Sequence, residues 1–385
     1  MDSPFIYDKH VTGKNFIGLR NETTILSNLL NAGENIVMYE APRKGKTSIT
    51  RQALFNMRIQ GRRFVVSEIN LLCVRTIGCF LTSLGDSVIR AFATTPEEYA
   101  GIVDRLLQGT HFIFDPQNYA DNDEILSLNW DVDDADIRAI LHLPYHLAAE
   151  NGTQLYVIID EFQNVNLTEN GDKICKIFES VMKEEREKGH TACSFILSGS
   201  QVNAMKEIFE HRRFFYRQVE HFSIGVVEDK EIIEHIVKGF LASGKVIDRD
   251  LLMGVCTLFK NDLWYINHFI SICDSLSKGY IMEPVLLDAL SRLLAIHEPR
   301  FYSIMYDLTS YQVSLLKAIV DGHIKFSTAE VISSYGLNSS ANVRRLKDAL
   351  CKKEIVTFND KDEPQILDPL FEYWLKKYYF KIKGI

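Results

Sequence analysis

The sequence predicts an α/β fold: a P-loop NTPase core with a parallel sheet, then a helical lid, then a C-terminal winged helix-turn-helix. Three observations favour this fold class. Short apolar runs alternate with helical spacing through the first 225 residues, which is typical of a parallel sheet covered by helices. A phosphate-binding sequence, GKT at 45–47, follows the first apolar run. Beyond residue 225 the strand pattern stops and helical repeats take over.

The elements of the core can be assigned in order along the chain. Helical spacing over residues 16–30, with a cap expected at Asn21, leads into an apolar run that predicts the first strand at 35–39. Residues 95–127 have weaker periodicity, and we expect an insertion or an irregular connection there. The other expected helices cover residues 48–58, 76–92, 134–150 (kinked at Pro144) and 172–188, and the other expected strands cover 62–72, 155–159 and 193–197.

Two further domains are expected after the core, which should cover residues 1–225. Residues 226–300 predict a helical lid, and residues 301–385 predict a winged helix because helical segments precede a hairpin pattern around the polar turn NDKDE. The lid helices are expected at 228–242, 248–259, 263–276 and 283–294. The winged helix is expected to have capping boxes at Thr309-Gln312 and Ser327-Glu330, a third helix at 339–352 and hairpin strands at 354–358 and 364–367.

Composition limits the class of protein. The 385 residues carry a formal net charge of -8, with 46% apolar and 24% charged residues, as in a globular protein of two or three domains. No run approaches the roughly 20 apolar residues of a membrane span. The chain also begins without the basic-then-apolar pattern of a signal sequence, so we expect a cytoplasmic protein without membrane contact. The seven cysteines contain no C-x-x-C spacing and predict neither a cysteine zinc site nor disulfides.

The phosphate-binding loop is the first candidate site. Because it follows a strand and opens a helix, the backbone amides from Lys44 through Gly45, Lys46 and Thr47 to Ser48 are expected to point at phosphate oxygens. The Lys46 ammonium would reach the β and γ phosphates, and the Thr47 hydroxyl would ligate Mg²⁺. The expected ligands are therefore ATP and Mg²⁺.

One position departs from the G-x-x-x-x-G-K-[ST] pattern, because Glu40 stands where the first glycine is expected. If the backbone there needs a positive φ, a residue other than glycine costs about 1–2 kcal/mol. A carboxylate turned inward would repel phosphates, so we expect Glu40 to point to solvent or to pair with Arg43 or Lys44. Glu40 puts rapid hydrolysis in doubt more than binding.

An acidic pair supplies the second half of the candidate site. Asp160 and Glu161 directly follow the apolar run LYVII. A single acid at a strand end is usually only solvated, whereas a pair in this order after GKT favours a nucleotide site. In such a site Asp160 would position Mg²⁺, and Glu161 would orient and polarise the attacking water.

Other polar residues have two readings each. Ser198 and Ser200 follow the next apolar run, where a serine could contact the γ phosphate or the attacking water, or could simply form a turn. Arg217 could act as an arginine finger or an inter-domain latch. With Arg212 and Arg213 nearby, it could equally belong to a solvated basic face.

The third helix of the winged helix has a basic outer face. Its spacing turns Asn342, Arg344, Arg345 and Lys347 outward, which suits contacts in a DNA major groove. However, residues 301–385 hold 12 Lys and Arg against 10 Asp and Glu, and this net +2 is small for a DNA-binding domain. A DNA partner and a protein partner therefore both stay open.

Several segments together resemble the archaeal-type P-loop ATPases, a prokaryotic group related to the AAA+ and STAND ATPases. The segments are FIGLRNE, YEAPRKGKTS, LYVIIDEFQNV, FILSGSQVNAMKEIF, FFYR and ILDPLFEYWLKK, and they span nearly the whole chain. The resemblance implies an N-terminal box, an ATPase core, a helical lid and a winged helix. One further departure is the lid segment KNDLWYINHF, which lacks the G-x-P that the family often has before its aromatic residue.

The resemblance also implies roles for individual residues. The segment from Phe16 through Ile17 and Gly18 to Arg20 would flank the adenine, and residues 45–48 would bind ATP and Mg²⁺. Asp160 and Glu161 would be the acidic pair, with Ser200 near the sensor position and Arg217 matching an arginine of the family.

These residues predict an ATPase that acts as a nucleotide-dependent molecular switch with slow hydrolysis. One alternative is a winged-helix DNA-binding regulator in which ATP is structural or absent. Another is a protein-interaction scaffold with a vestigial P-loop. The sequence does not fix the oligomeric state.

Overall fold

The computed structural model describes residues 4–119 and 125–382. It confirms the predicted fold class, with a parallel α/β core and a C-terminal winged helix. The chain forms two compact units. We call Asn21–Glu40 with Thr50–Ile224 the sheet unit, and Met1–Arg20 with Ala41–Ile49 and Gly225–Ile385 the helical unit. The phosphate-binding loop after Glu40 thus groups with the helical unit.

The sheet unit contains a five-stranded sheet of order β2-β5-β6-β1-β7, in which every neighbouring pair is parallel. Parallel pairing places the carboxyl ends of all strands at one edge of the sheet. Asn70 and Asp160, the last residues of β2 and β5, are level in the ladder, as are Met38 and Ser198 of β1 and β6. The strands are β1 (Ile36–Tyr39), β2 (Phe64–Asn70), β5 (Gln154–Asp160), β6 (Cys193–Gly199) and β7 (Glu220–His221).

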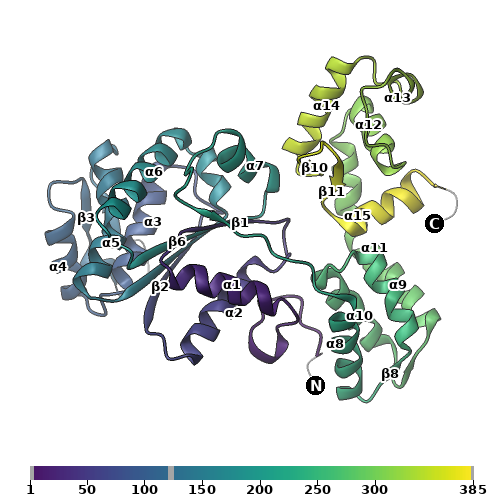
Figure 1. Ribbon diagram of the computed structural model, residues 1–385, viewed down its shortest axis with the longest axis horizontal. Helices are drawn as coiled ribbons and strands as arrows, with labels where there is room; N and C mark the ends of the chain where they lie inside the picture. The colour runs from purple at the N-terminus through teal and green to yellow at the C-terminus, as the bar shows by residue number, and fades with distance from the viewer. Residues whose placement is uncertain (1–3, 120–124, 383–385) are drawn as a thin grey trace. The chain divides into compact units, whose positions relative to one another are not determined.

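Helices cover both faces of this sheet, with α1 and α2 on one face and α3, α5 and α6 on the other (Figure 1). Alternate strand residues face the two layers, so Val157 and Ile159 join the core under α5 and α6. Tyr156 reaches α1, where its hydroxyl donates to the Leu30 carbonyl at 3.3 Å. The helices are α1 (Arg20–Asn31), α2 (Lys46–Ile59), α3 (Ile77–Arg90), α5 (Asp134–Glu150) and α6 (Gly171–Glu187), and α7 (Val202–Lys206) runs into a π-helical turn, η4 (Glu207–His211).

Residues 95–127 are expected to form an insertion or an irregular connection, and the second of these alternatives is wrong for the described part. That part forms α4 (Pro96–Leu106), the short η2 (Pro116–Tyr119) and a hairpin of β3 (Phe112–Phe114) and β4 (Leu126–Leu128), while 120–124 lie outside the described residues. The Thr95 hydroxyl caps α4 by accepting from the Glu98 amide at 3.2 Å. The periodicity is weak because this short helix buries only Tyr99, Ile102 and Val103.

Two expected helix caps are wrong. Asn21 lies inside α1, which begins at Arg20. In the winged helix, Thr328 caps the second helix in place of Ser327, because its hydroxyl accepts from the Val331 amide at 3.3 Å. Both serine and threonine are good caps, so the choice depends on where the first turn begins. The other capping box, Thr309 with Gln312, is confirmed.

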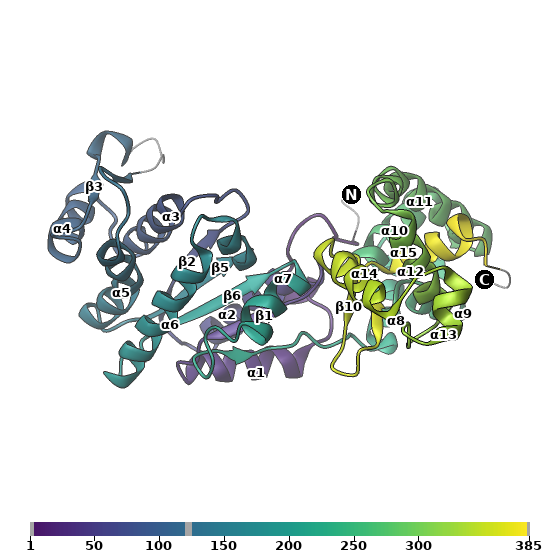
Figure 2. The same ribbon diagram turned by 90° about the horizontal axis from the view of Figure 1, so that it is seen from above.

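The helical unit has one apolar core that includes both lid and winged-helix residues. Helix α11 was expected to end at 294 but continues through Pro299 to Tyr306, so a helix joins the two regions in place of a linker. In the winged helix, α12, α13 and α14 pack together and the β10–β11 hairpin lies beside α14 (Figure 2). The elements are η1 (Gly13–Asn15), α8 (Asp229–Ala242), β8 (Val246–Ile247), α9 (Arg249–Phe259), α10 (Leu263–Leu276), β9 (Tyr280–Ile281), α11 (Glu283–Tyr306), α12 (Ser310–Val320), α13 (Ala329–Tyr335), α14 (Ser340–Lys352), β10 (Val356–Phe358), β11 (Pro364–Ile366), α15 (Pro369–Trp374) and η5 (Leu375–Tyr379).

Candidate functional site

The carboxyl edge of the sheet brings together polar side chains from three strands. Asp160 ends β5, and its Oδ1 accepts a hydrogen bond from the Ser198 hydroxyl on β6 at 2.6 Å. From the other side, Asn70 Nδ2 at the end of β2 lies 3.4 Å from Asp160 Oδ2. Asp160 is therefore held by both neighbouring strands, and its partners within the sheet unit are neutral.

Glu161 is held by a second serine. Its Oε2 accepts from the Ser200 hydroxyl at 2.6 Å and from Gln163 Nε2 at 2.5 Å. The backbone of Glu161 is left-handed, with φ of 55°, a conformation that costs a residue with a side chain about 1–2 kcal/mol. Such strain at a strand end is typical of functional sites. The sequence segments DEF and SGS thus form two parallel serine–carboxylate pairs.

Within the helical unit, the phosphate-binding loop has the backbone that its sequence predicts. Gly45 has φ of 91°, and a Cβ added to it would meet no atom within 4 Å. Glycine is therefore required here by backbone conformation. The Ile49 amide donates to the Gly45 carbonyl at 2.9 Å as α2 begins. Lys46 is 7% exposed, and its ammonium donates to the Ala41 carbonyl at 3.2 Å.

The N-terminal segment of the chain lies in the same unit as this loop. The Val11 amide donates to the Ser48 hydroxyl at 3.1 Å, so the Ser48 side chain contacts the N-terminal segment. Gly18 has φ of 62°, and an added Cβ would lie 2.7 Å from the Glu231 carboxylate. Phe16 follows η1, and Ile17 packs against the core of the helical unit.

Two cations of the loop contact the start of α10. Lys44 forms an ion pair with Asp262 at 2.7 Å. The Asp262 carboxylate is 5% exposed and also caps α10 by accepting from the Trp264 and Tyr265 amides. The Arg43 guanidinium stacks over the Trp264 ring, 4.0 Å from its centroid. The segment NDLW, at which the family's G-x-P is missing, therefore holds the loop directly.

The strained, left-handed backbone conformation in the loop occurs at Arg43 rather than at Glu40, where it was considered from the sequence. Glu40 is absent from the residues with positive φ, whereas Arg43 has φ of 68°. The expectation that the Glu40 side chain points to solvent or pairs with Arg43 or Lys44 stays a prediction. The contacts found for these two cations are the ion pair of Lys44 with Asp262 and the stacking of Arg43 on Trp264. The substitution at Glu40 thus avoids the backbone penalty considered for it.

Arg217 lies at the amino edge of the sheet, opposite the acidic pair. It precedes β7, which is level with the start of β1, and its carbonyl accepts from Arg186 at the end of α6 at 3.0 Å. The Arg217 side chain is exposed. Within the sheet unit it is therefore away from Glu161.

The outer face of α14 is only partly free. Arg344 and Arg345 are exposed, and no ion pair involves either one among the described residues. Lys347 is 16% exposed and pairs with Asp362, and the Asn342 amide donates to the Leu337 carbonyl at 3.0 Å. The basic face predicted from four residues is reduced to two arginines.

Three polar residues that hold the predicted site residues were not predicted from the sequence. Asn70 and Gln163 contact the two acids, and Asp262 contacts Lys44. Asn70 could have been found as a polar residue at the end of a predicted strand. Asp262 could not, because its partner lies more than 200 positions away in the sequence.

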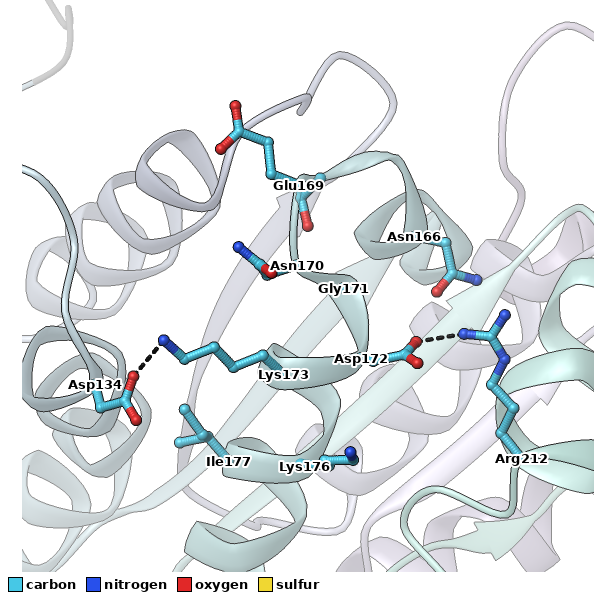
Figure 3. A pocket seen from close by; sticks show the side chains of 11 residues that line it. Asp134, Asn166, Glu169, Asn170, Gly171, Asp172, Lys173, Lys176, Ile177 and Arg212 are labelled. Carbon is cyan, nitrogen blue, oxygen red and sulfur yellow. Dashed lines mark hydrogen bonds and ion pairs between the residues drawn. The ribbon is translucent and has the colours of Figure 1, made fainter.

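A pocket of about 690 Å³ lies at the N-terminus of α6, away from these residues (Figure 3). None of the predicted site residues lines it. Lys173 pairs with Asp134, and Arg212 with Asp172. Its two paired cations are thus already neutralised.

The residues present fit Mg²⁺ and a nucleotide. Mg²⁺ prefers oxygen ligands; the Asp160 carboxylate is such a group in the sheet unit, and the Thr47 hydroxyl is another in the helical unit. The open, positive-φ backbone at Gly45 leaves room for phosphate oxygens beside the amides that start α2.

Comparison with known proteins identifies the fold. The Walker-type ATPase PABY2304 of Pyrococcus abyssi superposes with a TM-score of 0.67 at 14% identity, over 97% of this chain and 99% of that one. The ADP form of the ORC2 protein of Aeropyrum pernix gives a TM-score of 0.56 at 12% identity, over 96% and 94%. A family described as a probable winged helix domain matches residues 299–377. A search of curated protein sequences gave no match.

The chain therefore has the fold of archaeal Walker-type ATPases with a C-terminal winged helix, as the sequence resemblance implied. Among the described residues, no helix combines the length and apolarity needed to cross a bilayer.

Proposed function

We propose that this protein binds Mg-ATP at the phosphate-binding loop, hydrolyses it slowly in the cytoplasm and works as a nucleotide-dependent switch. The observation that carries the proposal is the pair of serine–carboxylate contacts at the carboxyl edge of the sheet, Ser198 with Asp160 and Ser200 with Glu161. Strand β1, a neighbour of β6, ends at that same edge, and the GKT loop follows β1 in the sequence. Ligands of open α/β sheets bind there, and the ADP form of the A. pernix protein supports a nucleotide.

In this proposal each residue has a separate task. The Lys46 ammonium and the amides of residues 44–48 bind the phosphates, while Thr47 and Asp160 hold Mg²⁺, which neutralises phosphate charge when bound. Glu161 orients the attacking water and accepts its proton. Ser200 and Gln163 fix the Glu161 carboxylate by hydrogen bonds to Oε2.

Slow hydrolysis follows from the position of Arg217. An arginine that contacts the γ phosphate speeds P-loop hydrolysis by about 1,000- to 100,000-fold. Arg217 lies at the other edge of the sheet, so we propose that it could act only on the site of another copy of the chain.

The nucleotide site is tested by Lys46→Ala. The variant loses the buried ammonium and should lose Mg-ATP binding, measured as the ligand-induced rise of the thermal midpoint. Lys278→Ala, at an exposed lysine between α10 and β9, is the matched control and should keep the full rise. Undiminished binding by the Lys46 variant would overturn the assignment.

The switch is tested at the ion pair between Lys44 and Asp262. Asp262→Asn removes the charge but keeps a good cap for α10. Releasing Lys44 to the phosphates should tighten Mg-ATP binding by about 1 kcal/mol, or roughly fivefold. Asp248→Asn changes a cap of α9 in the same way and should leave the affinity unchanged. Equal affinities of the Asp262 variant and the unaltered protein would contradict this coupling.

A DNA-binding regulator is the second candidate function, and the exposed Arg344 and Arg345 on α14 favour it. It requires duplex binding that weakens with salt and is lost in the double variant Arg344→Ala, Arg345→Ala. If that binding is also indifferent to nucleotide, the regulator replaces the switch. If no duplex binds, the winged helix is left with a protein partner. If Mg-ATP also fails to raise the thermal midpoint, the result favours the interaction scaffold with a vestigial phosphate-binding loop.

A further inference from the structure

Two histidines and a buried glutamate lie together between α5 and α6, away from the nucleotide site. His142 and His146 are four positions apart on α5, so both project from one face of that helix. Their rings lie 5.8 Å apart and nearly parallel, at 13°. Glu185 comes from α6, which packs alongside α5 (Figure 1). One ligand atom of each residue lies within 4.8 Å of the other two.

The cluster occupies the amino edge of the sheet. Helix α5 ends at Glu150, just before β5 begins, and α6 ends at Glu187, just before β6 begins. His146 and Glu185 are close to those helix ends, whereas Asp160 and Ser198 lie at the carboxyl ends of the strands. The cluster can therefore be tested independently of the nucleotide site.

Side-chain contacts hold the Glu185 carboxylate in place, as hydrogen bonds from surrounding residues hold the ligands of a metal ion. The carboxylate has no exposed surface. Its Oε2 contacts His190 Nδ1 at 2.5 Å, and its Oε1 contacts His142 Nδ1 and the Lys188 ammonium, each at 2.7 Å. A fully buried carboxylate is costly to place without a cationic partner, and the Lys188 ammonium fills that role here.

His146 does not take part in this network by hydrogen bonding. Among the described residues no hydrogen bond is found for it, although it stacks on His142. An ion-pair cluster around Glu185 explains His142, His190 and Lys188 but gives no role to His146.

We propose that His142, His146 and Glu185 form a binding site for a zinc-class divalent cation. Two imidazole nitrogens and one carboxylate oxygen are a typical zinc donor set, whereas Mg²⁺ and Ca²⁺ prefer oxygen ligands alone. The cation joins α5 to α6 at the amino edge of the sheet. His190 holds the Glu185 carboxylate from the second oxygen, and Lys188, which is 51% exposed, turns to solvent when the cation binds.

A second cluster shows why this one is distinctive. His111, Asp133 and Asp136 also lie within reach of one another. However, both oxygens of Asp136 already accept backbone amides, one from His111 and one from Asp133, and the second bond belongs to the capping box of α5. Backbone donors thus account for that cluster, whereas the donors to the Glu185 carboxylate are all side chains.

The test measures zinc affinity of the full chain after chelator treatment, by competition with a chromophoric chelator in excess Mg²⁺. We expect one Zn²⁺ per chain, and a Co²⁺ complex whose absorption spectrum indicates nitrogen and oxygen ligands. His146→Gln should weaken zinc binding by at least the roughly 10- to 100-fold that loss of an outer-shell partner costs. Since His146 has no hydrogen bond to lose, this variant should keep the thermal midpoint of the metal-free protein.

Control variants separate the metal site from an ion-pair cluster. His211→Gln, at an exposed histidine paired with Glu207, and Lys46→Ala should leave zinc affinity unchanged. Lys188→Gln should raise it, because the ammonium no longer competes for Glu185 Oε1. Absence of stoichiometric zinc, displacement by Mg²⁺, unchanged affinity of the His146 variant or weaker binding by the Lys188 variant would each overturn the proposal.

Discussion

The two edges of the central sheet hold carboxylates in opposite ways. At the carboxyl edge, the partners of Asp160 and Glu161 within the sheet unit are hydroxyl and amide groups. At the amino edge, Glu185 contacts two histidines and a lysine. Neutral partners fix the position of a carboxylate but leave its charge available. The Lys188 ammonium is a cationic partner, which fixes the position of Glu185 and also offsets its charge until a metal cation replaces it.

The difference has consequences for protonation at the amino edge. Burial alone would raise the pKa of Glu185, but hydrogen bonds from Lys188, His190 and His142 outweigh it and lower the pKa to about 2. This carboxylate therefore stays ionised and contributes to stability. The carboxylates of the other edge, with neutral partners, are better suited to accept a proton during a reaction.

The largest expected effect comes from removing the charge of Glu161 at the carboxyl edge. Glu161→Gln keeps the shape of the side chain but cannot accept a proton from water. We expect Mg-ATP binding to remain and turnover to fall by about 100- to 10,000-fold. Phosphate release and ligand-induced thermal stabilisation measure the two effects.

Glu187→Gln, at an exposed acid at the end of α6, is the control and should keep full turnover. If Glu161→Gln hydrolyses ATP at the rate of the unaltered protein, Glu161 has no role in proton transfer.

The sequence predicted the carboxyl edge better than the amino edge, for a physical reason. Asp160 and Ser198 each end a strand, and parallel pairing brings strand ends together whatever the details of packing. Glu185 lies within a helix, and its contact with His142 depends on how α5 packs against α6. The pair of histidines four positions apart was visible in the sequence, but its acidic partner 43 residues away was not.

The contacts of the phosphate-binding loop show the same limit. The sequence shows that Glu40 replaces the first glycine of the loop pattern. It does not show which loop residue has the left-handed backbone, and in the structure that residue is Arg43 rather than Glu40. The pairing of Lys44 with Asp262 likewise depends on a tertiary contact between the loop and α10. Local sequence patterns therefore predicted the ends of the strands and the phosphate-binding loop. The residues that contact the loop depend on tertiary packing and could not be predicted in this way.

A smaller effect is expected at the amino edge from Glu185→Gln. The variant replaces charge-assisted hydrogen bonds by neutral ones and should lose about 2–3 kcal/mol of unfolding free energy at pH 7. The folded-state pKa of about 2 lies below the ordinary value of 4.5. The stabilisation is therefore complete above pH 4.5 and is lost as the pH falls toward 2.

Urea unfolding of both proteins at pH 7 and pH 3, in the presence of a chelator, measures this contribution. The difference between them should shrink at the lower pH. Glu184→Gln is the matched control, because Glu184 is the next residue and is 39% exposed, and it should cost less at pH 7. A difference that is the same at both pH values would show that the charge of Glu185 does not stabilise the fold.

The smallest effect is expected from Ser200→Ala at the carboxyl edge. The variant removes the 2.6 Å hydrogen bond to Glu161 Oε2 but leaves the contact from Gln163 Nε2. Losing one of two neutral donors should raise the barrier to hydrolysis by about 1 kcal/mol, or roughly fivefold in turnover. Mg-ATP affinity should stay the same, because Ser200 acts on the water-activating group rather than on the phosphates.

Ser180→Ala is the matched control for this variant. Ser180 also donates to a carboxylate, Glu184 Oε1 at 2.7 Å, but on α6, and its loss should leave turnover unchanged. If Ser200→Ala keeps full turnover, the serine only forms a turn, and Glu161 is positioned by Gln163 and its own left-handed backbone. If turnover falls as far as in Glu161→Gln, the neutral partner is needed for the carboxylate to act at all, and the carboxyl edge depends on its hydrogen bonds as strongly as the amino edge depends on its charges.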